Sequence, residues 1–340
     1  MSLTILRNPE QSPLEPLLGK TVAVIGFGNQ GHAHALNLRE SGVNVLVGSR
    51  PDSPGSSRAR ESDFSAVSIQ DASGRADLAI LALPDEVQPQ VYEQLVAPNL
   101  KPGATLGFLH GFNIRFGFIK PRPDIGVIMV APKGPGRTLR ERFVAGQGIP
   151  CLFALHQDSP QRDAQAIGLA WANGIGCARA GVIFTTFKDE TDTDLFGEQT
   201  VLCGGMTELV IAAFETLVNA GYPPELAYLE CCHEVKQIAD LVYARGLAGM
   251  MQAISNTAEF GAYQAGPMVI DDHTRQRMRE VLNRIQNGAF ANDLRADHAR
   301  GFAWFNAQRE KLRDHPIEAA GKSIRALMPW LAEQDHGKSV

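Results

Sequence analysis

A short apolar run that leads into three closely spaced glycines constrains this chain more than any other feature. Residues Thr21–Ile25 have the β-branched and small side chains of a buried strand, and Gly26, Gly28 and Gly31 follow, just before a helical pattern at 32–40. In the strand–turn–helix unit of dinucleotide-binding domains, such glycines permit the tight turn, the approach of the pyrophosphate and close helix–strand packing. The sequence therefore predicts a dinucleotide site formed by Gly26, Phe27, Gly28, Asn29, Gln30 and Gly31.

The N-terminal half repeats this alternation of short β-branched runs and helical patterns. Helix candidates at 32–40 and 85–95 separate several of the runs, which predicts parallel βαβ units in a doubly wound α/β domain of Rossmann type. We expect a loop at 51–57, and strands at residues 21–25, 43–47, 78–83, 105–109, 127–130, 151–155 and 182–185.

The second half of the chain has a different sequence pattern. From about residue 192 to Trp330 the pattern is helical with almost no strand candidates, and Gly221 and Pro223 are placed to end one helix and start the next. A chain of 340 residues also exceeds what one hydrophobic core usually serves. We expect a doubly wound domain at 1–185, an all-α domain at 186–330 and a flexible tail at 331–340.

Two carboxylate pairs recur in the helical half at i, i+4 spacing: Asp194 with Glu198, and Glu230 with Glu234. This spacing places each pair on one face of its helix. Carboxylates among apolar neighbours repel one another and lose solvation, and divalent cations held between them relieve both effects. Ligands that are all oxygen favour Mg²⁺ or Mn²⁺ over Zn²⁺. A solvated helix face explains either pair equally well, so spacing alone leaves both interpretations open.

Composition argues against several classes of protein. The net charge is −5, and Lys and Arg are spread along the chain, so no nucleic-acid-binding surface is expected. Residues 1–17 lack the apolar core of a signal peptide, and no apolar run approaches membrane-spanning length, so we expect no membrane partner. The five cysteines lack a framework spacing, which is typical of reduced thiols in a cytoplasmic protein.

The end of the second strand indicates which dinucleotide binds. Where an NAD-binding chain would carry an acidic residue, this sequence has Arg50, followed by Asp52 and Ser53. Arginine favours the 2′-phosphate of NADP, whereas a carboxylate would repel that phosphate and accept hydrogen bonds from a free ribose hydroxyl. We predict that all three residues contact the cofactor, with NADPH preferred and NADH also accepted.

Six ordered segments carry a specific resemblance to one enzyme family. They are GFGNQGHAHALNLRESG (26–42), HGFNI (110–114), APKGPG (131–136), TDLFGEQTVLCGG (193–205), ECCHE (230–234) and ISNTAEFG (254–261). Together they resemble the ketol-acid reductoisomerases in their shorter, class I form, and the resemblance runs from the first strand to Trp330.

The resemblance implies the composition of an active site. It implies two Mg²⁺ ions held by Asp194, Glu198, Glu230 and Glu234, with Ser255 contacting the substrate and His110 and Lys133 lining the site. It also implies a knotted helical domain and a homodimer, or a larger homo-oligomer, in which the second carboxylate pair serves the partner's site. The residues expected to act in catalysis are His110, Lys133, Glu198 and Glu230, and Gly136 is expected to contact the cofactor.

The residues themselves give weaker support to some of these roles. Lys133 follows a strand at the edge where such sheets bind ligands, so it could bond a reacting oxygen, although a surface lysine fits too. A loop role explains His110, and a helix-capping role explains Ser255, equally well. Two residues depart from the family pattern: Phe184, where an acidic residue is usual, and Asp52, where glycine is commoner.

The implied reaction converts 2-acetolactate or 2-aceto-2-hydroxybutyrate to the 2,3-dihydroxy acid by alkyl migration and then hydride transfer, in branched-chain amino-acid biosynthesis or a specialised pathway. Metal ions stabilise charge in the migration, and the nicotinamide supplies the hydride. Two other functions fit a two-domain dinucleotide-binding chain. One is a metal-free hydroxyacid dehydrogenase, which would not need four carboxylates, and the other is an NADP-sensing binding protein without turnover.

Overall fold

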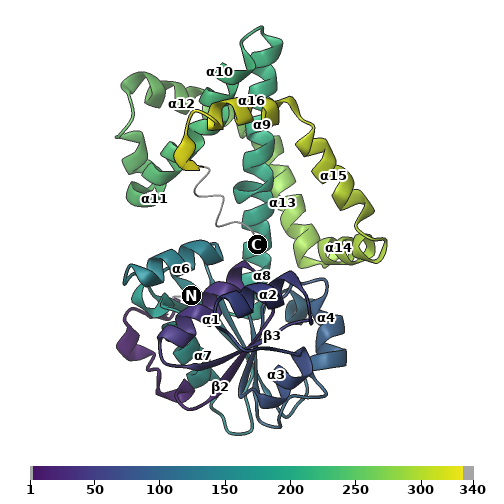
Figure 1. Ribbon diagram of the computed structural model, residues 1–340. Coiled ribbons are helices and arrows are strands. Elements are labelled where there is room, and N and C mark those ends of the chain that lie inside the picture. Colours follow the sequence, from purple (N-terminus) through teal and green to yellow (C-terminus); the bar gives the residue numbers. More distant parts are fainter. Residues whose placement is uncertain (1–2, 332–340) are drawn as a thin grey trace. The chain divides into compact units, whose positions relative to one another are not determined.

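The computed structural model describes residues 3–331, and the chain divides into two compact units (Figure 1). The division lies between Thr193 and Asp194, inside helix α8 (Phe187–Gly197). The boundary expected from the sequence, at 185/186, lies just before this helix begins. One continuous helix therefore belongs to both units, and the expected tail lies, except for Leu331, outside the described residues.

A nine-stranded sheet forms the centre of the first unit, in the order β1-β9-β8-β7-β6-β5-β2-β3-β4. Strands β2 to β7 pair in parallel, as the βαβ pattern predicts. The strands are β1 (Ile5–Leu6), β2 (Thr21–Ile25), β3 (Asn44–Gly48), β4 (Ala66–Val67), β5 (Leu78–Leu81), β6 (Thr105–Phe108), β7 (Gly126–Pro132), β8 (Cys151–Gln157) and β9 (Val182–Phe184).

The sheet is mixed, because two strand pairs that lie outside the predicted parallel βαβ units are antiparallel. Strand β8 runs antiparallel to β7, and β1 runs antiparallel to β9. The first residue of β8, Cys151, pairs with the last residue of β7, Pro132, so the chain re-enters the sheet at the edge where it left. A parallel strand would require a crossover back to the opposite edge. Strands β1 and β4, of two residues each, are too short to leave a sequence pattern.

Helices cover both faces of this sheet (Figure 1). Residues of α1, α6 and α7 pack in one core, around Trp171, and residues of α3 pack in the other, around Phe108. The helices of the unit are α1 (Asn29–Glu40), α2 (Pro54–Glu61), α3 (Ile69–Arg75), α4 (Gln88–Val91), α5 (Phe112–Arg115), α6 (Gly136–Val144) and α7 (Ala164–Gly174). The loop expected at 51–57 ends early, because Ser53 caps α2 and Pro54 begins it.

The described part of the second unit, residues 194–331, is helical without strands, as expected. Its small core joins Phe214, Tyr228 and Ile324. Gly221, at φ +94°, separates α9 from α10 as predicted. The helices are α9 (Gly204–Asn219), α10 (Pro224–Tyr228), α11 (Val235–Met251), α12 (Asn256–Val269), α13 (Asp272–Gln286), α14 (Ala289–Ala299), α15 (Ala303–Arg313) and α16 (Pro316–Arg325).

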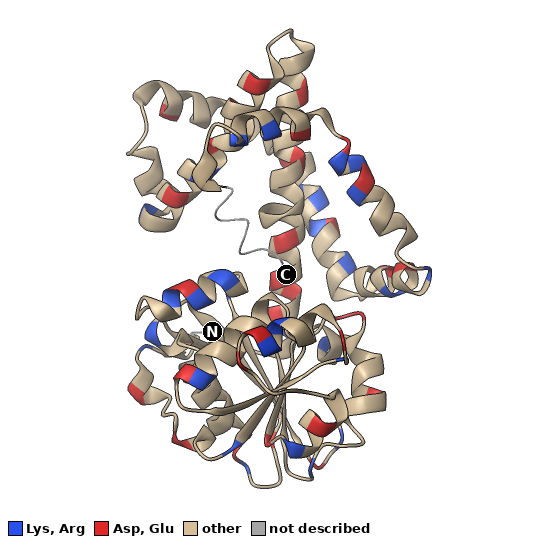
Figure 2. Cartoon of the chain, in the orientation of Figure 1, with Lys and Arg blue, Asp and Glu red and all other residues tan. Residues whose placement is uncertain are grey.

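Many large apolar side chains of the helical unit are exposed, among them Leu209, Tyr243 and Trp304. Acidic and basic residues are interspersed over the visible face of the chain (Figure 2). By length and composition alone, the continuous helix 187–219 could cross a membrane, and only 6% of its most apolar stretch is buried. The sequence expectation that no apolar run approaches this length is therefore wrong by that criterion.

Candidate active site

Three predicted site residues follow neighbouring parallel strands. Gly26 comes directly after β2, Lys133 directly after β7, and His110 two residues after β6. Because β2, β5, β6 and β7 pair in parallel, their carboxyl ends lie at one edge of the sheet. Ligands of open α/β sheets bind at this edge. The strand order thus brings the dinucleotide turn, the histidine and the lysine to the same edge.

A buried carboxylate that the sequence analysis missed joins the histidine to the lysine. Glu190 of α8 is 1% exposed, and its Oε1 accepts a hydrogen bond from Lys133 Nζ at 3.0 Å. His110 Nδ1 lies 3.2 Å from the same oxygen. The backbone N–H of Gly111 donates to Oε2 at 3.0 Å. One available signal was its spacing: Glu190 precedes Asp194 by four residues, as Asp194 precedes Glu198.

These donors keep Glu190 ionised. Burial alone would raise the pKa of this carboxyl group, but the hydrogen bonds and charges of His110 and Lys133 outweigh burial and hold the pKa at about 2. The carboxylate is therefore negative at any physiological pH. Because it accepts from three groups at once, its role in this arrangement is to hold donors in place.

Close packing at Gly111 allows this arrangement. A Cβ atom at this position would lie 2.8 Å from the carbonyl oxygen of Phe187, and would also collide with the hydroxyl of Thr191. Only glycine brings its backbone amide near enough to α8 to reach Glu190. The glycine of HGFNI thus has a local structural cause.

The glycine turn has the geometry that the sequence predicts. Gly26 adopts φ +100°, and a Cβ there would lie 2.5 Å from the carbonyl oxygen of Ala82. A Cβ at Gly31 would collide with the backbone of Gly26, so both positions require glycine. Gly28 precedes α1, whose first backbone amides form the amino-terminal end that binds phosphate in such domains.

The segment that carries Lys133 packs on this glycine turn. The amide nitrogen Nε2 of Gln30 donates to the carbonyl oxygen of Gly134 at 3.0 Å. A Cβ at Gly136 would collide with the carbonyl group of Asn29. The predicted cofactor residues Asn29, Gln30 and Gly136 are therefore in contact, and Phe27, 2% exposed, packs beneath them in the core.

The loop after β3 presents Arg50 and Asp52 to solvent. Asp52 adopts the left-handed conformation, at φ 55°. The hydroxyl of Ser53 donates to the carbonyl oxygen of Arg50 at 2.8 Å and accepts from the N–H of Ser56 at 3.2 Å. Ser53 must therefore give up a local bond before it can donate to a cofactor phosphate.

Asp194 lies one helical turn after Glu190 on α8, so the two carboxylates share a helix face. Ligand atoms of His110, Glu190 and Asp194 lie within 4.8 Å of one another, and among the described residues this is the one such group of three. Glu198, a further turn on, is exposed, and it begins a π-helical segment, Glu198–Leu202.

The second carboxylate pair has the same local structure. Glu230 lies in the π-helical segment Leu229–His233, and Glu234 directly follows it; both side chains are exposed. Such segments are rare and are frequent at functional sites. Several apolar neighbours of these pairs are exposed, Val201 by 55% and Leu226 by 44%, although Leu195 beside Asp194 is buried. In the single chain, burial therefore does not force a cation between them.

Ser255 caps α12, where its hydroxyl accepts the backbone N–H of Ala258 at 3.2 Å. The capping role considered for it is thus present. This bond uses the hydroxyl oxygen as acceptor only, so the hydroxyl proton can still be donated to a ligand.

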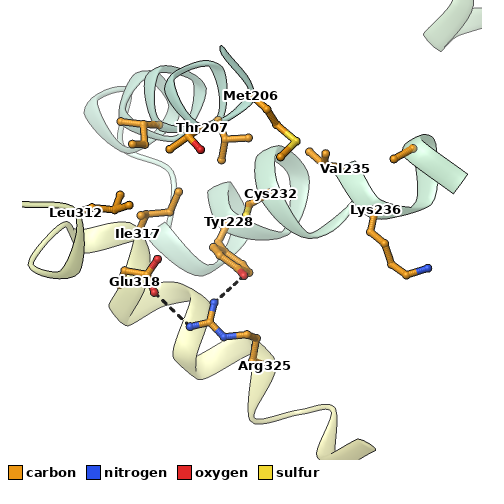
Figure 3. A pocket seen from close by; sticks show the side chains of 13 residues that line it. Met206, Thr207, Tyr228, Cys232, Val235, Lys236, Leu312, Ile317, Glu318 and Arg325 are labelled. Carbon is orange, nitrogen blue, oxygen red and sulfur yellow. Dashed lines mark hydrogen bonds and ion pairs between the residues drawn. The ribbon is translucent and has the colours of Figure 1, made fainter. Parts of the chain in front are cut away.

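The helical unit also holds a cavity of about 500 Å³ (Figure 3). Tyr228, Cys232 and Lys236 line it at helical spacing, together with Arg325, which donates to the Tyr228 hydroxyl at 3.0 Å. Neither carboxylate pair lines the cavity. It is therefore separate from the predicted site residues.

Comparisons with known proteins agree with this architecture. The model of the acetohydroxy acid isomeroreductase NADPH-binding domain matches residues 16–181, and that of the ketol-acid reductoisomerase C-terminal domain matches residues 187–330. An NADH-preferring ketol-acid reductoisomerase from an uncultured archaean is 43% identical, with a TM-score of 0.93 over 96% of this chain and 99% of its own.

More distant structures share the fold alone. A semialdehyde dehydrogenase NAD-binding protein from Cupriavidus necator, solved with calcium and NAD, has a TM-score of 0.60 at 21% identity over 79% of this chain and 99% of its own. A pyrroline-5-carboxylate reductase from Coxiella burnetii has a TM-score of 0.54 at 14% identity over 80% of this chain and 98% of its own.

Proposed function

Because the chain belongs to the ketol-acid reductoisomerase family, we propose that it converts 2-acetolactate or 2-aceto-2-hydroxybutyrate to the 2,3-dihydroxy acid in a Mg²⁺-dependent reaction. The observation that supports this most directly is the carboxylate of Glu190, which binds both His110 and Lys133 with Asp194 one turn away. Such an arrangement joins proton-donating groups to a potential metal ligand.

Lys133 is the proposed proton donor to the substrate. Its Nζ is 3.0 Å from Glu190, and its side chain remains 33% exposed, so a ligand can reach the ammonium group. The hydrogen bond to the carboxylate fixes the direction of the ammonium group. When hydride adds to the carbonyl carbon, an ammonium held in this way can deliver a proton to the carbonyl oxygen. His110 shares the same carboxylate and is positioned beside it.

The proposed metal ligands are Asp194 and Glu198 with Glu230 and Glu234. The residues fit a hard divalent cation, because every proposed ligand atom is a carboxylate oxygen. Glu190 fits this role less well, since its oxygens already accept bonds from Lys133 and Gly111. When bound, two Mg²⁺ ions would supply Lewis acidity that stabilises negative charge on the substrate oxygens during alkyl migration.

A homodimer, or a larger homo-oligomer, is the proposed assembly. Glu230, Glu234 and Ser255 are exposed in the single chain, and the helical unit exposes large apolar side chains around them, including Leu226 and Ile238. Burying apolar surface of this kind against a second copy is favourable, and a two-fold interface places each chain's second carboxylate pair near its partner. Exposed apolar side chains within residues 187–219, among them Val201 and Leu209, would be buried by the same kind of association, which would account for the membrane-like hydropathy of this helix.

Both nicotinamide cofactors are proposed to bind, with NADPH preferred by a small margin. Arg50 favours the 2′-phosphate, whereas Asp52 opposes it and the hydroxyl of Ser53 is engaged locally. The relative at 43% identity is NADH-preferring, which also favours a narrow margin. The cysteines are free thiols, consistent with the proposed cytoplasmic location.

The decisive assay is oxidation of NADPH in the presence of 2-acetolactate, measured with Mg²⁺ and after chelation, with the 2,3-dihydroxy acid identified as product. We expect turnover that requires Mg²⁺. Turnover that survives complete chelation would contradict the metal proposal and favour a metal-free dehydrogenase. Cofactor binding without any turnover would contradict the enzymatic proposal.

A further inference from the structure

Three consecutive residues of α8 contact one short segment, residues 110–115. Glu190 accepts from Gly111, the hydroxyl of Thr191 lies against the same glycine, and Asp192 binds Arg115. Successive residues of an α-helix are about 100° apart around its axis. The segment therefore contacts α8 over roughly half of its circumference.

On the side of α8 away from Glu190, the contact is an ion pair with two hydrogen bonds. Arg115 Nε lies 3.0 Å from Asp192 Oδ1, and Nη2 lies 3.3 Å from Oδ2. The side chain of Asp192 is 5% exposed and that of Arg115 is 19% exposed. A two-bond guanidinium–carboxylate pair specifies direction as well as distance, which a lysine cannot reproduce.

We propose that Arg115 is a positioning residue: its pair with Asp192 fixes the rotation of α8 against residues 110–115 and so holds Glu190 in register with His110 and Lys133. Without the pair, α8 would keep the contacts of Glu190 and Thr191 with Gly111 and the packing of Phe187 in the core, and its face that carries Asp192 would be free to shift relative to Arg115. The inference rests on the proposed function, because Lys133 and His110 matter there through the reaction that they serve.

The expected loss of kcat follows from the sensitivity of catalysis to the positions of the catalytic groups. A displacement of about 1 Å at a catalytic group can cost on the order of a hundredfold in rate. The dinucleotide turn is built from β2 and α1, which these contacts do not involve. Loss of the pair should therefore lower kcat without changing cofactor binding.

The test compares Arg115→Gln, Arg115→Lys and Asp192→Asn with two matched controls. Lys188→Gln removes the other partner of Asp192, an exposed ammonium at 3.0 Å that does not bind the 110–115 segment. Arg122→Gln removes a similar two-bond pair with Asp124, which precedes β7 at the opposite edge of the sheet. Measurements are kcat and KM with 2-acetolactate, melting temperature, and hydrogen–deuterium exchange of the peptide covering residues 109–116.

We expect Arg115→Gln and Asp192→Asn each to lower kcat by tenfold to a hundredfold, with KM for NADPH within about twofold of the wild-type value. The variant that carries both changes should lose no more activity than either single variant, because both changes remove the same pair. Exchange at the Gly111 amide should accelerate at least tenfold. Arg115→Lys should also lose activity. If Arg115→Gln does not fold, Arg115→Lys tests the proposal in its place. Both controls should keep kcat and this exchange rate.

Wild-type kcat and unchanged exchange in Arg115→Gln would overturn the proposal. So would an equal loss of kcat in Arg122→Gln, because the effect would then follow general stability. If the wild-type chain fails to turn over 2-acetolactate, the proposed function is wrong, and the exchange measurement still decides whether the pair holds the segment on α8.

Discussion

Lys133 Nζ and Glu190 Oε1 lie 3.0 Å apart although 57 residues separate them in the chain. Lys133 directly follows the carboxyl end of β7, and Glu190 lies in the first turn of α8. The contact joins the dinucleotide-binding sheet to the helix that carries the first proposed metal ligands, Asp194 among them.

Glu190→Gln should lower kcat at least a hundredfold. The amide has nearly the same shape, but it carries no charge, and its NH₂ group would face a donor, either Lys133 or the Gly111 amide. We expect the free energy of unfolding to fall by about 1–3 kcal/mol, as for a buried donor left unsatisfied. Steady-state kinetics and NADPH titration measure the effect, and Glu141→Gln, in an exposed ion pair with Arg137, is the control. Wild-type turnover in Glu190→Gln would refute the role of this carboxylate.

Asp194→Asn and Glu198→Gln should each abolish turnover at ordinary Mg²⁺ concentrations and leave NADPH binding nearly unchanged. Each change removes a charged oxygen ligand, whereas the phosphates bind at the glycine turn of the first unit. Glu208→Gln, on the exposed surface of α9, is the matched control and should remain active. Calorimetric titration with Mg²⁺ gives an independent readout. Full activity in either variant would eliminate that residue as a ligand.

Mixing two inactive variants should restore part of the activity if the sites are shared between chains. In a heterodimer of Asp194→Asn and Glu234→Gln protomers, one site carries both lesions and the other carries neither. Co-refolding at equal amounts gives half heterodimers, so we expect about a quarter of wild-type activity. If heterodimers form and no activity returns, each site is built from a single chain.

The sequence revealed the parts of the fold and the site that depend on local pattern. The glycine turn, most strands of the sheet and the helical second half follow from periodicity and glycine placement, and the structure confirms them. The antiparallel direction of β8 was not predicted, because pairing direction depends on where the chain re-enters the sheet, which periodicity does not record. The four-residue spacing of Glu190 from Asp194 could have drawn attention to it, but its role becomes visible only when folding brings His110 and Lys133 to it.

The π-helical segments also could not be predicted from the sequence. Glu198 and Glu230 have ordinary helical spacing to their partners, and the local widening of the helix depends on tertiary packing. Of the two interpretations that spacing left open for these carboxylates, the single chain shows exposed side chains for Glu198, Glu230 and Glu234.

Stability of the first unit should fall below pH 6.5 because of His34. The imidazole is fully buried, its Nδ1 accepts the indole N–H of Trp171 at 3.0 Å, and burial lowers its pKa from 6.5 to about 3. Between these values the unfolded chain binds a proton that the folded chain does not, so the free energy of unfolding decreases as pH falls, by up to about 1.4 kcal/mol per pH unit. This contribution is complete above pH 6.5.

His34→Gln keeps an acceptor for Trp171 but has no group that titrates. Urea unfolding at pH 7.5, 6.5, 5.5 and 4.5 should show the wild-type advantage shrinking as pH decreases. A difference between the two proteins that stays constant over this range would contradict the assignment to His34.

Cofactor preference depends on the balance between Arg50 and Asp52. A charge-assisted bond from Arg50 to a 2′-phosphate contributes roughly 1.5–3 kcal/mol. Repulsion by the carboxylate of Asp52 in an exposed loop costs on the order of 1–3 kcal/mol and is reduced by salt. The two effects nearly cancel, so the ratio of kcat/KM for NADPH over NADH should exceed one by a small margin.

Asp52→Gly should raise this ratio, mainly through a lower KM for NADPH, because it removes the repulsion and glycine tolerates the φ of 55° at this position. Arg50→Ala should lower the ratio. Asp52→Asn is the control that separates charge from conformation, since asparagine also accepts the left-handed region but is neutral. If Asp52→Gly and Asp52→Asn both leave the ratio unchanged, the carboxylate points away from the phosphate, and this loop selects its cofactor through Arg50 alone.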